Sequence, residues 1–169
     1  TEIRAMNSIA ILSIEDEPEV REAIRRDLRP FENQFRIEAA EDVADAREAI
    51  AQIEADGGRV GLILADHRLP GETGVDFLTQ LHADEDHRAV RKVLLTGQAD
   101  QQDTIRAINQ GGLHHYIAKP WDPQTLAEVV RNELTAFVLE HDDIDPMPYV
   151  AVLDGPKLLE KISRGPRID

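Results

Sequence analysis

Acidic, hydroxyl and basic side chains stand directly after the apolar runs of this sequence. Glu15 and Asp16 follow the first run, Asp66 follows the third, and Thr96 and Lys119 follow the fourth and fifth. A carboxylate can bind a hard cation, and it can attack phosphorus to form an acyl phosphate. A lysine ammonium neutralises charge on a transferring phosphoryl group, and a hydroxyl can hydrogen-bond its oxygens. The residue types therefore indicate phosphoryl chemistry, provided that the fold brings them together.

Each of these side chains also has a structural explanation when it is taken alone. An acidic pair such as Glu15-Asp16 is common at a solvated helix N-terminus. Asp66 is equally suited to cap a helix, and Thr96 is suited to cap a turn. The functional interpretation depends on finding all of them at strand ends, in one order.

The apolar runs have the length of strands and alternate with amphipathic stretches of helical period. We predict strands at Ser8–Ile14, Phe35–Ala39, Val60–Ala65, Val90–Leu95 and Leu113–Ala118. We predict helices over residues 18–29, 42–55, 73–83, 100–110 and 123–140. This alternation is typical of an α/β fold in which helices cover both faces of a parallel sheet.

The polarity of the strands also predicts their order. Gly61–Ala65 is apolar throughout, as a central strand buried on both faces should be, whereas Phe35–Ala39 alternates like an edge strand. This pattern favours the flavodoxin-like, doubly wound order 2-1-3-4-5 for the five strands. In such sheets the site forms beyond the carboxyl ends of the strands, where the order reverses. We therefore expect the chemically active residues to meet at that edge.

Three crowded carboxylates repel one another unless a cation separates them. Mg²⁺ prefers oxygen ligands and usually accepts one or two carboxylates directly. We expect Asp16 and Asp66 to contact Mg²⁺, Glu15 to act through water, and the main-chain carbonyl of Arg68 to supply a further ligand. Asp66 then becomes the predicted phosphoacceptor, with Lys119 neutralising charge on the phosphoryl oxygens.

From Ser8 to Glu140 the chain resembles the receiver domain family of response regulators, which act in two-component signalling. The motifs that carry the resemblance are IAILSIEDEP at 9–18, LILADHRLPGETGVDFL at 62–78, VLLTG at 93–97 and YIAKPW at 116–121.

The resemblance implies a role for each site residue. Asp66 is implied as phosphoacceptor, with Glu15 and Asp16 as the acidic pair. Thr96 and Lys119 are implied as the switch residues that respond to the phosphoryl group. It also implies that Tyr116 turns inward as a switch residue when the domain is phosphorylated, and that the peptide bond before Pro120 is cis.

Two residues depart from the commonest family pattern. Glu15 stands where aspartate is commoner, so its carboxylate reaches further towards the cation. Arg68 stands two residues after the phosphoacceptor, where its cationic side chain can reach or shield the phosphoryl group. We hypothesise that Arg68 alters the lifetime of the phosphoaspartate.

The resemblance also implies partners. A histidine kinase or phosphotransfer protein, docking near the first helix, is expected as phosphodonor. The fourth helix, fifth strand and fifth helix are the expected readout face, for a downstream protein, a fused output domain or a homodimer. Homodimerisation through the C-terminal tail is a further hypothesis.

The composition argues against nucleic acid and membrane partners. The net charge of −14 repels phosphate backbones and anionic lipids. The apolar runs fall far short of the roughly 20 residues that a membrane span needs. The chain contains no cysteine, which fits a reducing compartment, and residues 1–7 lack a signal-peptide pattern. We therefore expect a cytoplasmic protein.

The chain divides into a predicted receiver domain at residues 1–140 and an extension at 141–169. The extension begins with a linker rich in aspartate and proline, continues with an expected short strand at Tyr149–Asp154, and ends with an expected helix over residues 157–163. Gly155-Pro156 is expected to break these two elements apart. The extension either folds back on the receiver or forms a docking arm that adds a strand to a partner's sheet.

The predicted function is a phosphorylated signalling switch, not an enzyme. The alternative is a phosphate-independent interaction module, for which Glu15 is the only support in the sequence. A flavodoxin-like binder of FMN is disfavoured because Glu15-Asp16-Glu17 would repel its phosphate. A phosphatase of the haloacid dehalogenase type is disfavoured because it requires an aspartate where Arg68 stands.

Overall fold

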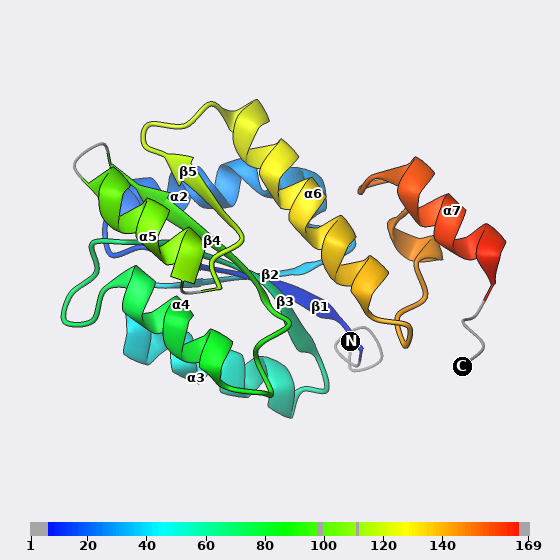
Figure 1. Cartoon of the computed structure of the whole chain (residues 1–169), viewed down its shortest axis with the longest axis horizontal. Coiled ribbons are helices and arrows are strands. Elements are labelled where there is room, and N and C mark those ends of the chain that lie inside the picture. The colour runs from blue at the N-terminus through cyan, green and yellow to red at the C-terminus, as the bar shows by residue number, and fades with distance from the viewer. Residues whose placement is uncertain (1–6, 98–99, 111, 166–169) are drawn as a thin grey trace.

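Five parallel strands form one sheet in the computed structural model, which describes residues 7–97, 100–110 and 112–165 (Figure 1). The strand order is β2-β1-β3-β4-β5, as predicted. The strands are β1 at Ile9–Ile14, β2 at Arg36–Ala40, β3 at Arg59–Asp66, β4 at Arg91–Thr96 and β5 at His115–Ala118. The flavodoxin-like α/β fold class is therefore confirmed.

The helices cover the two faces of the sheet in separate layers (Figure 1). They are α2 at Pro18–Asp27, α3 at Val43–Ala55, α4 at Gly74–Ala83, α5 at Gln101–Gln110 and α6 at Pro123–Glu140. A further helix, α7 at Gly155–Arg164, belongs to the extension and lies against α6. Alternate residues of β1 supply the two cores, because successive strand residues point to opposite faces. Ile9 and Ile11 pack with α2 and α6, whereas Ala10 and Leu12 pack with α3, α4 and α5. None of the described helices combines the length and apolar character needed to cross a membrane.

The first helix ends earlier than predicted. The apolar pattern predicts a helix over 18–29, but α2 ends at Asp27 and a 3-10 turn, η1, occupies Arg29–Phe31. Pro30 explains the difference, because it has no N–H to donate to the carbonyl four residues earlier and its ring would clash with that carbonyl.

The fifth strand begins two residues later than predicted. His114 precedes β5, and its Nδ1 accepts a hydrogen bond of 2.9 Å from the backbone N–H of Lys92. The imidazole of His114 thus accepts the backbone hydrogen bond that a strand carbonyl would otherwise accept. Burial, together with the positive charges of Arg91 and Lys92, lowers the pKa of His114 to about 4, so the ring stays neutral and can accept this bond.

The predicted strand at Tyr149–Asp154 is wrong. Met147–Tyr149 forms a 3-10 turn, η3, and the chain continues as turns to Leu153, whose N–H donates to Tyr149 O at 2.9 Å. Pro146 and Pro148 favour this local turn over an extended segment, because each proline fixes φ and lacks an N–H. Gly155 and Pro156, expected to interrupt the chain, instead form the first turn of α7.

The extension packs on the receiver through apolar side chains. Leu158 of α7 is fully buried, and Tyr149 and Leu153 belong to the same core cluster as α2 and α6. The Tyr149 ring stacks on Phe35, with ring centroids 5.1 Å apart. Lys161 Nζ donates to the carbonyls at the C-terminal end of α6, including Val138 O at 3.1 Å. The docking role of the extension and the domain boundary at residue 140 stay predictions.

Replacing Leu158 by alanine tests whether the extension stabilises the receiver. We expect Leu158→Ala to lower the free energy of unfolding by about 2–5 kcal/mol, through lost burial and a cavity. The measurement is chemical denaturation followed by circular dichroism. Leu159→Ala is the matched control, because Leu159 is 49% exposed and its loss should cost about 0.5 kcal/mol or less. Equal stabilities of the two variants would contradict an integrated extension.

Candidate functional site

The carboxyl ends of four strands converge on one group of side chains. Glu15 follows β1, Asp66 ends β3, Thr96 ends β4, and Lys119 follows β5. Two backbone hydrogen bonds extend the sheet past these ends, from His67 N to Leu95 O at 3.0 Å and from Lys119 N to Thr96 O at 2.8 Å. The sheet therefore fixes the separation of residues that lie far apart in the sequence, as the strand order predicts.

Three carboxylates form the acidic part of this group. Glu15, Asp16 and Asp66 each offer an oxygen, and these oxygens lie within 4.8 Å of one another. Glu15 is fully buried and Asp66 is 5% exposed, whereas Asp16 is exposed. Burial and the nearby charge of Asp66 raise the pKa of Glu15 to about 7, in spite of the opposing effect of Lys119. Negative charge therefore accumulates in a place poorly reached by water.

Lys119 lies between the two buried carboxylates. Its Nζ is 3.0 Å from Asp66 Oδ1 and 3.2 Å from Glu15 Oε2. Burial lowers the pKa of Lys119, but its hydrogen bonds and ion pairs with Asp66 and Glu15 outweigh burial and raise it. The lysine is therefore held as an ammonium, and it can offset only part of the charge of the three carboxylates.

The donor set fits a hard divalent cation. All three side chains offer oxygen, the atom that Mg²⁺ prefers, and an added cation would offset the burial and the charge of Asp66 that raise the pKa of Glu15. Sequence reasoning found each of these carboxylates. The expected ligand role of the Arg68 carbonyl stays a prediction.

Gly74 allows α4 to begin directly beside Asp66. Its N–H donates to His67 O at 2.9 Å, which closes the loop that follows β3. A Cβ on Gly74 would lie 2.2 Å from the backbone oxygen of Asp66, closer than any side chain can stand. The glycine is therefore required by this close approach, a role that its place in the sequence motif did not reveal.

Thr96 is fully buried and already has hydrogen-bonding neighbours. Its Oγ1 lies 3.1 Å from Gly97 O, to which it donates, and 3.2 Å from the hydroxyl of Thr104 in α5. Tyr116 on β5 is 38% exposed, so its ring is accessible at the surface. Thr96 thus joins the group of site residues, whereas the switch role implied for Tyr116 stays a prediction.

The guanidinium of Arg68 binds Asp100, the residue directly before α5. Its Nε donates to Asp100 Oδ2 at 2.9 Å and its Nη2 donates to Asp100 Oδ1 at 3.2 Å. Hydrogen bonding to Asp100 is the main cause that raises the pKa of Arg68, and the charge of Asp66 adds to it. Sequence reasoning missed Asp100, because nothing in its local pattern marks a partner that lies 32 residues away.

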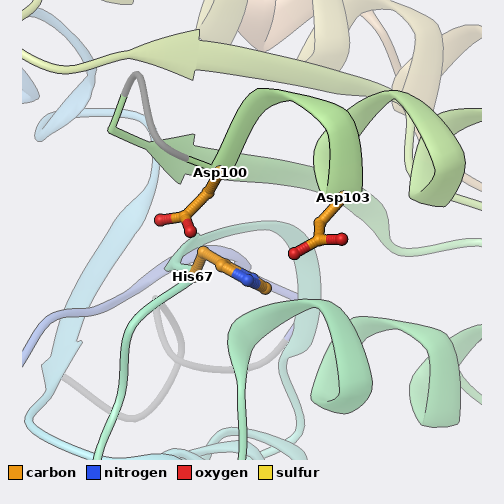
Figure 2. A group of neighbouring side chains, drawn as sticks. All are labelled: His67, Asp100 and Asp103. Atoms are coloured by element: carbon orange, nitrogen blue, oxygen red, sulfur yellow. The ribbon is translucent and has the colours of Figure 1, made fainter.

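Asp100 also belongs to a second cluster of residues whose types can bind a metal ion (Figure 2). His67, Asp100 and Asp103 each offer one atom within 4.8 Å of the other two. Both oxygens of Asp100 already accept hydrogen bonds from Arg68, and Asp103 is exposed. Since the guanidinium satisfies the buried carboxylate of this cluster, its geometry indicates an ion pair and not a metal centre.

Trp121 joins the loop after Lys119 to the end of α2. The indole Nε1 donates to Asp27 Oδ2 at 2.8 Å, and Arg26 Nε lies 3.2 Å from the other oxygen of Asp27. The peptide bond between Lys119 and Pro120 is cis, as the family resemblance implies. The hydrogen bond of Trp121 thus connects the loop that carries Lys119 to the C-terminal end of α2.

The fold and the site together define a receiver domain. Residues 11–131 match the response regulator receiver domain, and the chain belongs to this family. Its members in two-component systems are regulatory phosphoacceptors, and the family implies Mg²⁺ in the acidic pocket. The resemblance inferred from the motifs is therefore confirmed.

Several transcriptional regulators are similar to the chain. The hydrogenase transcriptional regulatory protein HoxA of Cupriavidus necator is 32% identical over 132 residues, which make up 78% of this chain and 25% of that protein. The phosphate regulon transcriptional regulatory protein PhoB of Escherichia coli is 31% identical over 121 residues, 72% of this chain and 49% of that protein. The chain thus spans between a quarter and a half of the length of these relatives.

Solved receiver domains have the same fold. The signal receiver domain of an HD domain-containing protein from Pseudomonas fluorescens Pf-5 superposes with a TM-score of 0.68 and 25% sequence identity. The superposition covers 82% of this chain and 94% of that one.

The raised pKa of Glu15 predicts that Mg²⁺ affinity depends on pH. Cation binding favours the ionised carboxylate, so protons compete with Mg²⁺ below the pKa. With a pKa of about 7, we expect the affinity to fall roughly tenfold from about pH 8 to about pH 6, following the ionised fraction of Glu15. The measurement is isothermal titration calorimetry with MgCl₂. Glu15→Gln, which does not titrate, should show a flatter profile; an equally steep profile would assign the proton elsewhere.

Proposed function

We propose that the chain is a phosphorylation-dependent signalling switch in which Asp66 accepts the phosphoryl group. The observation that carries this proposal is the position of the Asp66 carboxylate. It is buried at a strand end, with Lys119 Nζ at 3.0 Å and the oxygens of Glu15 and Asp16 within 4.8 Å. The Asp66 carboxylate is therefore a nucleophile beside the ammonium of Lys119, and the neighbouring carboxylates can bind a metal cation as well.

The chemistry begins with a carboxylate oxygen of Asp66, which attacks the phosphorus of a phosphohistidine on the donor protein. A P–O bond forms, the P–N bond breaks, and the departing imidazole nitrogen keeps the electron pair and takes a proton. Glu15, Asp16, Asp66 and the Arg68 carbonyl would hold Mg²⁺, which neutralises negative charge on phosphoryl oxygens when it is bound. Lys119 orients the Asp66 carboxylate and supplies its own positive charge.

Phosphorylation then changes the neighbourhood of Thr96 and Tyr116. The new group brings a charge of about −2 and three acceptor oxygens. Thr96 turns its hydroxyl towards one of these oxygens and gives up its contact with Thr104 of α5, which is 3.2 Å in length. Tyr116 moves inward from its exposed position and alters the face formed by α5, β5 and α6. This exchange links the phosphoryl group to a docking surface.

The partners follow from the family and from the names of the relatives. A histidine kinase or phosphotransfer protein docks near α2 and supplies the phosphoryl group. The face of α5, β5 and α6 acts on a downstream protein, a fused output domain or a second copy of the chain. HoxA and PhoB are transcriptional regulators, which supports an output in gene expression. The cytoplasm is the proposed location, supported by the absence of cysteine.

Intact mass spectrometry tests the phosphoacceptor. After incubation with Mg²⁺ and acetyl phosphate, we expect the wild-type protein to gain the mass of one phosphoryl group. Asp66→Ala, and wild type treated with EDTA, should gain none, because the nucleophile or the cation is missing. Circular dichroism establishes that the variant is folded. If a folded wild-type protein forms no adduct, the chain acts as a phosphate-independent interaction module instead.

The decay of that adduct tests the effect of Arg68 on phosphoaspartate lifetime. We expect Arg68→Ala to speed the loss of the phosphoryl group by roughly twofold to fivefold, because an exposed cationic side chain no longer shields the acyl phosphate. The loss is followed by intact mass over time. Arg25→Ala, which removes an exposed arginine from α2, is the control and should decay at the wild-type rate. Identical decay in all three proteins would remove the hypothesis.

A further inference from the structure

Two contacts attach the strand ends of the site to the first turn of α5. The guanidinium of Arg68, from the loop after β3, binds both oxygens of Asp100 at 2.9 and 3.2 Å. The hydroxyl of Thr104 lies 3.2 Å from that of Thr96 at the end of β4, and it also donates to Asp100 O at 2.9 Å. The side chain of Asp100 is therefore bound by Arg68 after β3. Its backbone carbonyl is connected through Thr104 to Thr96 at the end of β4.

The two halves of the ion pair differ in burial. The Asp100 side chain is 12% exposed, whereas the Arg68 side chain is 72% exposed. A buried carboxylate is costly to leave without a partner, so Asp100 requires Arg68 as long as α5 keeps this position. The arginine remains hydrated on its outer side and can change partners at low cost. Arg68 is therefore the half of the pair that can leave.

Arg68 also lies within the electrostatic reach of the phosphoacceptor. The charge of Asp66 contributes to the raised pKa of Arg68, after the larger effects of Asp100. Phosphorylation would replace the single negative charge of Asp66 by about two, on three acceptor oxygens. Arginine binds phosphoryl oxygens in the same two-pronged geometry with which it binds carboxylate oxygens. The phosphoryl group would thus compete with Asp100 for one guanidinium.

We propose that the Arg68–Asp100 ion pair is a latch that holds the N-terminal turn of α5 until Asp66 is phosphorylated. The guanidinium then turns towards the phosphoryl group, Asp100 loses its partner, and the first turn of α5 moves to expose this carboxylate to water. The latch rests on the proposed phosphorylation of Asp66, and it adds to the release of Thr96 a second connection between the site and α5. It makes α5 the element whose docking surface phosphorylation changes.

The strength of the latch is limited. Ion pairs with an exposed partner contribute modestly, so loss of this one should raise the opened population of α5 by roughly twofold to fivefold. A full reversal from 1:99 to 99:1 needs a preference of roughly 10⁴-fold. The latch therefore biases the equilibrium between the closed and opened positions of α5. The remaining preference for the opened position comes from the contacts of Thr96 and Lys119 with the phosphoryl group.

Backbone amide hydrogen exchange over α5 tests the latch. Without phosphodonor, we expect Asp100→Asn and Arg68→Gln each to speed exchange in residues 101–110 by roughly twofold to fivefold, because the pair contributes about this factor. The double variant should exchange no faster than the quicker single variant, because both changes remove one interaction. Asp103→Asn, which removes a neighbouring acid that Arg68 does not bind, and Arg25→Gln are the controls and should match wild type.

The same measurement with Mg²⁺ and beryllofluoride, a phosphoryl analogue, tests the release. Wild-type α5 should then exchange as fast as α5 in Asp100→Asn, and the variant should respond less than wild type. Intact mass spectrometry after incubation with acetyl phosphate, run in parallel, distinguishes failure of the latch from failure of the proposed phosphorylation of Asp66. A protein that accepts the phosphoryl group but whose α5 exchange stays unchanged overturns the latch and leaves the phosphoacceptor standing. Folded single variants that exchange like wild type also overturn it, and a protein that forms no adduct overturns both.

Discussion

The excess of carboxylates over cationic groups at the buried strand ends is the interaction on which the rest of the structure depends. Glu15 and Asp66 are buried at adjacent strand ends, and Lys119 bridges them at 3.2 and 3.0 Å. Burial and the charge of Asp66 raise the pKa of Glu15 to about 7, and the single ammonium of Lys119 opposes this rise only in part. A hard divalent cation bound to these oxygens would offset part of this excess negative charge. The electrostatics of the site therefore depend on what binds to it.

The parallel sheet turns that local imbalance into a property of the whole domain. The order β2-β1-β3-β4-β5 places the ends of β1, β3 and β4 together, and backbone hydrogen bonds carry β3 and β5 past their last ladder residues. Helix α5 begins where β4 ends, and it is bound to the site through Arg68–Asp100 and through Thr96–Thr104. At the other end of the sheet, α7 and Tyr149 pack over α6 and Phe35 and fix the opposite end of the same core.

The strand order and the group of site residues could be predicted because both follow from local patterns. Apolar Gly61–Ala65 signals a central strand, and a polar residue after each strand identifies the site. The partner of Arg68 could not be predicted, since Asp100 lies 32 residues away and only the folded loop brings the two together. The strand expected at Tyr149–Asp154 was mispredicted for a different reason. The continuous apolar run after Pro148 imitates a strand, yet the two nearby prolines favour turns, and a 3-10 turn forms at Met147–Tyr149.

The indole of Trp121 gives the protein an intrinsic optical probe. It is the only tryptophan of the chain, and it follows Lys119 by two residues. Its Nε1 donates to the buried Asp27 at 2.8 Å, so the ring is half-buried beside a carboxylate that is itself paired with Arg26. Indole emission shifts in wavelength and intensity when its hydration or its neighbouring charge changes. Cation binding or rearrangement around Lys119 can thus be followed by fluorescence in the unlabelled protein, with no second tryptophan to obscure the signal.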